Sequence, residues 1–360
     1  MHWLMFMLLA VFLSGSPAWA GQAQPSEGKG FEQRKVLFSG HSLLDNPLPD
    51  WVEMIARSKS KTLIWEEQIV IGSPVRVRSW GDGGWAGYRD GKNKRGEDLD
   101  IATELKHSRD ATPYDALVLA EAHNLLSMVL WENAIGYLRH FHERLLDGNR
   151  NGKTFYYHSW LDIDKRDPAP WMAHEENAAV TWQCVAEKAR LTLEADGRSS
   201  NIVLLPAGSA LVELVRRSLD GRIAGIQGRP EERMNQIFAD NVHLTEAGIY
   251  YLAAVTYASL FGQSPEGAAV PPSVPAALAR DLQSTAWSAV GKARQQAEGS
   301  RPSMEMCRRV LAEKTCPSYW SMKGEPGQVN QCRSFFSQTN PGSGNAFLWP
   351  DPDWVALPDP

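Results

Sequence analysis

Apolar and polar positions alternate along the chain in two rhythms that predict strands followed by helices. Short apolar runs that end at Gly, Pro or Asn are typical of buried strands, whereas apolar residues three and four positions apart are typical of helices. The predicted strands are residues 36–39, 62–71, 114–120, 153–158 and 201–205. The predicted helices are residues 48–58, 131–146, 178–195, 210–218, 245–261 and 274–298. This alternation indicates an α/β fold in which helices cover both faces of a five-stranded parallel sheet.

Residues 73–112 interrupt the alternation and are rich in glycine. The glycines of this segment are Gly81, Gly83, Gly84, Gly87, Gly91 and Gly96. Glycine at this density favours loops over regular elements. We therefore expect a loop-rich insertion that faces the functional site.

The two ends of the chain differ in composition from the predicted α/β region. Residues 1–20 carry an apolar run that ends in Ala18-Trp19-Ala20, which is typical of a cleaved secretory signal and predicts a periplasmic or secreted protein. The run is short for a membrane anchor, and no later segment is long and apolar enough to predict a span in the mature chain. We expect a flexible leader over 21–34, a main domain over 35–262, a linker and helix over 263–300, and a Cys-containing extension over 301–360.

Four cysteines, Cys184, Cys307, Cys316 and Cys332, accompany the predicted export. An even number of cysteines in an exported chain indicates disulfides, and at least two of the three C-terminal cysteines should be bridged. Their connectivity stays open among three pairings. The spacing matches no zinc motif, so no metal site is predicted. The extension could be a disulfide-tied cap or an independent module.

Charge and aromatic content narrow the classes of partner. The 360 residues carry 37 basic and 42 acidic side chains, for a net charge of −5, without long runs of one sign. This balance argues against a nucleic-acid partner. The chain has 14 tryptophans, several of them in predicted loops (Trp80, Trp85, Trp160 and Trp171). They either pack in the core or form an aromatic platform for a sugar ring.

A serine, a histidine and an aspartate stand at positions that suit nucleophilic catalysis. Ser42 lies in a turn directly after the first predicted strand, and Asp240 and His243 are three residues apart in a later turn. A serine hydroxyl needs a neighbouring imidazole to take its proton, and a carboxylate to orient that imidazole. The alternatives are an ordinary turn serine, a helix-capping aspartate and a surface histidine. Of the other histidines, His140 and His142 should be solvated, and His123 and His158 follow strands near the expected site.

These segments resemble the conserved blocks of a known enzyme family. Gly40-His-Ser-Leu-Leu-Asp-Asn46 is similar to the first block of the SGNH (GDSL-type) hydrolases, with His41 in place of the usual Asp. Asp240-Asn-Val-His243 is similar to their last block. The resemblance covers residues 35–262 and implies a three-layer flavodoxin-like fold. It also implies a catalytic triad of Ser42, Asp240 and His243 that works without a cofactor.

The resemblance also implies donors for an oxyanion hole. They would be the backbone N–H groups of Ser42 and Gly72, and the side chain of Asn124. Gly72 follows the second strand, where Gly81, Gly83 and Gly84 are rivals. Asn124 follows the third strand in Ala122-His-Asn-Leu125, where Ala122 and Leu125 replace the Gly and Asp of the family's Gly-x-Asn-Asp block.

The function implied is ester hydrolysis through an acyl-Ser42 intermediate. Export and the Trp-rich loops favour O-acetyl groups on a polysaccharide as the substrate. An O-acetyltransferase would use the same triad, so this alternative stays open. A non-catalytic carbohydrate-binding protein on the same fold is a third possibility.

Overall fold

The computed structural model describes residues 32–80, 84, 86–93, 95–299, 301–351 and 353–357. The predicted signal segment 1–20 and nearly all of the leader lie outside the described residues. So do Gly81, Gly83 and Trp85.

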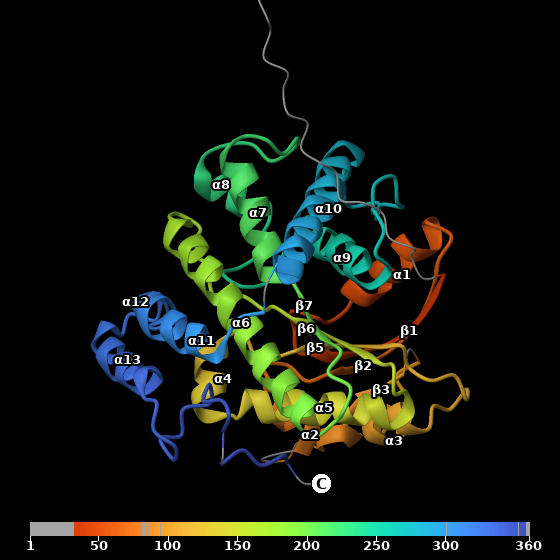
Figure 1. Cartoon of the computed structure of the whole chain (residues 1–360). Coiled ribbons are helices and arrows are strands. Elements are labelled where there is room, and N and C mark those ends of the chain that lie inside the picture. The colour runs from red at the N-terminus through yellow and green to blue at the C-terminus, as the bar shows by residue number, and fades with distance from the viewer. Residues whose placement is uncertain are drawn as a thin grey trace, which may run out of the picture.

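A mixed sheet of seven strands forms the centre of the molecule (Figure 1). Its strands are β1 (Gln33–Gly40), β2 (Thr62–Ile69), β3 (Gly91–Lys92), β4 (Asp98–Leu99), β5 (Ala116–Ala120), β6 (Lys153–Tyr157) and β7 (Ile202–Leu205). The order across the sheet is β4-β3-β2-β1-β5-β6-β7. Pairing is parallel among the neighbouring strands β2, β1, β5, β6 and β7, which are the five strands predicted above.

The prediction of a purely parallel five-stranded sheet was wrong at one edge. Two-residue strands β3 and β4 extend the sheet there and pair antiparallel. Strands of two residues have no hydrophobic period by which a sequence could reveal them. In chain order the parallel strands run 2-1-3-4-5, which is a doubly wound order with its switch point between β1 and β5.

Side chains on alternate positions of the strands feed two separate cores. Val36 and Phe38 of β1 pack with β5 residues against α1, α7, α9 and α10. Leu37 and its β5 neighbours Leu117 and Leu119 pack on the other face, against α3, α4, α5 and α6. Both faces of β1 and β5 are therefore buried, as their continuous apolar runs predict for a parallel sheet.

The helices surround the sheet (Figure 1). They are α1 (Leu48–Ser58), α2 (Val75–Trp80), η1 (Gly87–Arg89), α3 (Ile101–Lys106), α4 (Leu125–Trp131), α5 (Ala134–Gly148), α6 (Ala169–Ala195), α7 (Ala207–Leu219), α8 (Pro230–Met234), α9 (Glu246–Phe261), α10 (Ala276–Gly299), α11 (Met304–Val310), the π-helical turn η2 (Leu311–Thr315), α12 (Cys316–Met322), η3 (Pro326–Gln328) and α13 (Val329–Ser337). Each predicted helix is present, although α6 begins earlier than predicted, at Ala169.

The segment 73–112 is more regular than its glycines suggest. It holds α2, η1, α3 and the two antiparallel strands, so the expected loop-rich insertion also contains several short regular elements. Gly91 is required by close packing, because a Cβ there would lie 2.4 Å from Ile101 Cδ1. The glycine here serves contact between elements rather than a flexible loop.

One disulfide joins the C-terminal helices to the rest of the chain, and a second joins two of these helices to each other. Cys184 of α6 pairs with Cys307 of α11, and Cys316 pairs with Cys332. The prediction that at least two of the C-terminal cysteines are bridged is confirmed. The helices α11, α12 and α13 lie beside α4 and α6 and share a core with α6 (Figure 1). Disulfides of this kind persist in oxidising compartments.

Within the described residues, every helix is too short or too polar to cross a bilayer.

Candidate active site

The carboxyl ends of β2, β1 and β5 meet at the switch point of the sheet, and Ser42 lies there. β1 ends at Gly40, and Leu44 N–H donates to His41 O at 2.8 Å, which turns the chain sharply through Ser42. A Cβ on Gly40 would lie 2.8 Å from Leu44 Cβ, so only glycine allows this turn to close. Ligands of doubly wound sheets bind at such a point.

Asp240 and His243 belong to a short loop that is held closed at its base. Ala239 N–H donates to His243 O at 2.8 Å, and Thr245 N–H donates to Ile237 O at 2.9 Å. Thr245 is the N-cap of α9, because its side chain accepts from Gly248 N–H. Asp240 therefore does not cap the helix, and that alternative for the residue falls away.

The structure brings Ser42, His243 and Asp240 into one chain of hydrogen bonds. His243 Nε2 lies 3.0 Å from Ser42 Oγ, and His243 Nδ1 lies 2.7 Å from Asp240 Oδ2. Because a carboxylate can only accept, Nδ1 carries the proton and Nε2 is free to accept one from the serine. The side chains of His243 and Asp240 are 45% and 58% exposed, so the site is open to solvent and to large substrates.

Asp240 is held as an anion by the backbone of its own loop. Its Oδ1 accepts from Val242 N–H at 2.7 Å and from His243 N–H at 2.6 Å. Partial burial by itself raises the pKa of Asp240. The two N–H groups and the His243 ring lower the pKa by more than burial raises it, so its value is about 2. Asp240 is therefore charged throughout the neutral range.

His41 stands where the similar motif of the SGNH hydrolases has an aspartate, and it is a buried structural residue. Its Nε2 lies 3.0 Å from Glu121 O, and its Nδ1 accepts from Leu43 N–H at 3.4 Å. Burial, and next the positive charge of Arg78, lower the pKa of His41 to about 3. The ring is neutral, ties the Ser42 turn to the end of β5, and does not compete with His243 as a base.

A buried arginine beneath the site was not predicted. Arg78 of α2 donates to Ser39 Oγ at 3.0 Å, to Ser73 O at 2.8 Å and to Ala120 O. It thus joins the carboxyl ends of β1 and β5 to the segment that follows β2. Burial lowers the pKa of Arg78 to about 10, and the charge of Glu121 opposes that shift, so the guanidinium stays charged. Arg78 lies in Val75-Arg-Val-Arg-Ser-Trp80, where basic and apolar residues alternate, and nothing in this pattern distinguishes it from Arg76.

Glu121 is the acidic counterpart of Arg78 and is fully buried with it. Its Oε1 accepts from the backbone N–H groups of Val75 and Ala122 at 2.9 and 2.8 Å. Burial raises the pKa of Glu121, while the Arg78 charge and the two N–H groups lower it. This carboxylate fixes the start of α2 against the end of β5.

The three predicted oxyanion donors follow the strands that meet at this point. Gly72 comes just after β2 in a left-handed conformation with φ +69°, and Asn124 precedes α4. Val70 N–H donates to Gly40 O at 3.0 Å, so the chain after β2 stays beside the Ser42 turn. Among the described residues, the N–H groups of Ser42 and Gly72 and the side-chain amide of Asn124 have no hydrogen-bond acceptor. All three are therefore available to a ligand.

The segment after β6 holds the histidine loop in place. Trp160 Nε1 donates to Val242 O at 2.9 Å, and Ile163 N–H donates to Asn241 O at 2.8 Å. Trp160 and Trp171 are buried, so they pack in the core and are not part of an aromatic platform. Sequence reasoning missed the role of Trp160, since nothing links it to Val242 along the chain.

Three of the other histidines, His140, His142 and His158, are buried in the core. His140 and His142 are buried, against our expectation, because α5 packs both of its sides into the core. His140 Nδ1 bonds Tyr88 Oη, and His142 Nδ1 bonds Thr154 Oγ1. His158 is buried 3.3 Å from Glu175. Among the described residues, no three His, Cys, Asp or Glu side chains are grouped as metal ligands.

Comparison with known proteins gives information on the fold alone. No protein-family profile and no curated protein sequence matches the chain. The structure is similar to the crystal structure of a DUF4886 family protein from Bacteroides uniformis, with a TM-score of 0.50 and 15% identity. The similarity covers 72% of this chain and 95% of the other. At that identity it indicates a shared α/β fold.

Proposed function

We propose that this chain is an exported serine esterase with an SGNH-hydrolase-like fold and Ser42 as its nucleophile. The observation that carries the proposal is the hydrogen-bonded chain Ser42–His243–Asp240 at the switch point of the sheet. A neutral imidazole, oriented by a permanent anion and in contact with a serine hydroxyl, is the arrangement that acyl transfer needs.

The reaction follows from these contacts. Ser42 Oγ attacks the ester carbonyl carbon while His243 Nε2 takes the hydroxyl proton. The carbonyl oxygen becomes an oxyanion that the N–H groups of Ser42 and Gly72 and the amide of Asn124 stabilise. The C–O bond to the alcohol then breaks, and the alcohol leaves with the proton from His243. Water attacks the acyl-Ser42 ester in the same way and releases the acid.

Solvent exposure of the triad favours hydrolysis of a small acyl group carried on a large molecule. Nearly half of the His243 side chain is open. Water can therefore reach the acyl-serine, and a bulky alcohol can leave without being enclosed. O-acetyl groups on an extracellular polysaccharide fit this geometry, and the two disulfides agree with an oxidising location.

Release of acetate tests the proposal. We expect the full chain to hydrolyse 4-nitrophenyl acetate and to release acetate from an O-acetylated polysaccharide. Ser42→Ala should reduce both rates by about 10³-fold or more. Wild-type turnover by the folded Ser42→Ala variant would remove Ser42 from the mechanism.

A further inference from the structure

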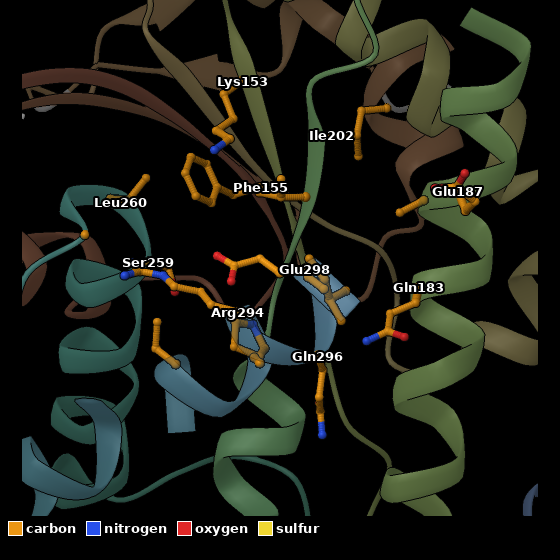
Figure 2. A pocket seen from close by; sticks show the side chains of 18 of the residues that line it. Lys153, Phe155, Gln183, Glu187, Ile202, Ser259, Leu260, Arg294, Gln296 and Glu298 are labelled. Atoms are coloured by element: carbon orange, nitrogen blue, oxygen red, sulfur yellow. The ribbon is translucent and has the colours of Figure 1, made fainter. Parts of the chain in front are cut away.

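A cavity lies beside β7, the outermost parallel strand, and is distinct from the Ser42 site. Its volume is about 400 Å³, a size typical of small-molecule sites. Figure 2 shows residues that line it from β6, β7, α6, α9 and α10. Lys153 begins β6 and Arg34 lies near the start of β1, whereas Ser42 follows the last residue of β1. The charged part of the cavity is therefore at the amino ends of the strands, opposite the triad.

Basic side chains outnumber acidic ones around this cavity. It is lined by Arg34, Lys153, Arg190, Arg294 and Arg301, against Glu187 and Glu298. Glu187 is already paired with Arg190 at 3.0 Å and lies 3.7 Å from Arg301. Arg301 also pairs with Glu194 at 3.0 Å, and the charge of Asp115 acts on Arg34. The positive charge of the lining is therefore centred on Lys153 and Arg294.

Lys153 is the cation that most needs a partner. Its Nζ lies 5.3 Å from the centre of the Phe155 ring, and among the described residues no oxygen accepts a hydrogen bond from it. Burial, followed by the charges of Arg34 and Arg294, lowers the pKa of Lys153. The Lys153 ammonium lies near two guanidinium groups and has no counterion of its own among the described residues. A bound anion would therefore stabilise it.

Most of the uncharged lining is apolar, although Gln183, Ser259 and Gln296 also contribute to it. Val203 and Leu204 of β7 line the cavity and are only partly buried, so they present apolar surface to it. Val203 pairs with Phe155 of β6, two residues from Lys153. An anion as small as phosphate would satisfy the cations and leave this apolar wall uncovered. A ligand with a charged head and a hydrocarbon chain covers both parts.

We propose that the cavity binds an amphiphilic carboxylate, with its head at Lys153 and Arg294 and its chain along Val203 and Leu204. In Figure 2 the Glu298 side chain points into the cavity from the end of α10, near Arg294. The charge of Glu298 already acts on Arg294. Glu298 is thus a competing carboxylate that a ligand displaces, and its charge opposes binding.

Calorimetric titration of the full chain with octanoate tests the proposal. We expect one site per chain. Lys153→Met keeps the apolar stem and should weaken binding by about tenfold or more, whereas Lys153→Arg should retain it. Glu298→Gln should strengthen binding severalfold, because the competing charge is removed. Lys292→Met is the matched control, since Lys292 lies on the same helix but pairs with Glu213 at 3.1 Å outside the cavity. It should bind octanoate like the wild type.

A second variant blocks the cavity without altering the core. Ala297 is exposed on α10 and lines the cavity, so Ala297→Trp should obstruct it and abolish binding. The proposal is overturned if octanoate does not bind, or if Lys153→Met binds it as the wild type does. It is also overturned if 1-octanol binds as tightly as octanoate, or if only inorganic phosphate binds.

Discussion

The side-chain amide of Asn124, which lies between β5 and the start of α4, has no hydrogen-bond partner among the described residues. A donor left free in this place is available to stabilise negative charge on a substrate. We expect Asn124→Ala to fold normally and to lower kcat on an acetyl ester by about 10²–10³-fold, with a smaller effect on KM.

Asn177→Ala provides a matched control for Asn124→Ala. Asn177 lies on α6, and its amide donates to Ala173 O within the same helix. That variant should keep wild-type kinetics. Near-normal turnover in Asn124→Ala would show that the Asn124 amide is not part of the oxyanion hole.

Glu67 of β2 makes stability depend on pH. Burial, and next the charges of Asp45, Asp50 and Glu66, raise the pKa of Glu67 to about 7, and its Oε2 is buried without a partner. The folded state therefore holds this proton more tightly than the unfolded state, where the carboxyl has an ordinary pKa near 4.5. Below pH 4.5 the Glu67 carboxyl is protonated in both states and does not lower the free energy of unfolding. As pH rises through 7, the folded state must hold the ionised carboxylate, so the free energy of unfolding falls.

Glu67→Gln should remove this loss. We expect the variant to be more stable than the wild type at pH 8 by about 1 kcal/mol, a value discounted for the partial exposure of Glu67. At pH 4 the two proteins should be nearly equal. Urea unfolding at both pH values measures this, and an equal difference at the two pH values would contradict it.

The sequence was informative for single residues whose neighbours are local or whose spacing is diagnostic. Ser42, Asp240 and His243 were grouped from two short motifs, and the structure places them within hydrogen-bonding distance. Arg78 and Glu121 could not be found in this way. They form their buried contacts only when the ends of β1 and β5 come together with α2, and no local pattern encodes that convergence.

At the scale of elements, the segment after β6 holds the histidine loop against the serine turn. Trp160→Phe keeps the aromatic packing but removes the N–H that binds Val242 O. We expect a loss of stability of about 1 kcal/mol. Because the His243 loop loses a support, kcat should fall by about tenfold and KM should change less.

Trp65→Phe is the control for Trp160→Phe. Trp65 of β2 is also buried, and its Nε1 donates to Glu53 Oε2 of α1, away from the histidine loop. The two variants should lose similar stability, and only Trp160→Phe should lose activity. Equal kcat values in stopped-flow or steady-state assays would show that the Val242 contact does not position His243.

Elements with strong periodicity were predicted well, and short ones were not. The central strands β1 and β5 contain continuous apolar runs because both of their faces are buried. The two-residue strands β3 and β4 and the six-residue helix α2 are too short to show a period. The start of α6 was also missed; Pro170 lies in its first turn, where proline is tolerated.

At the scale of the whole molecule, the disulfides tie distant parts of the chain together. Cys184–Cys307 joins residues 123 positions apart, and Cys316–Cys332 joins residues 16 apart. The longer loop restricts the unfolded chain more. We expect replacement of Cys184 and Cys307 by Ala to cost about 4 kcal/mol, and replacement of Cys316 and Cys332 to cost about 3 kcal/mol. Urea unfolding of the two double variants compares them, and a smaller loss for the longer loop would contradict the chain-entropy account.

Labelling with a fluorophosphonate tests most directly whether His243 activates Ser42. This reagent bonds to a serine oxygen whose proton is taken by a neighbouring base, and intact-mass analysis with peptide mapping locates the added group. We expect one phosphonyl group per wild-type chain, on Ser42. The Ser42→Ala variant should not react, and His243→Ala should react far more slowly. An unlabelled wild-type protein, a label on another serine, or a wild-type labelling rate in His243→Ala would contradict the proposed mechanism.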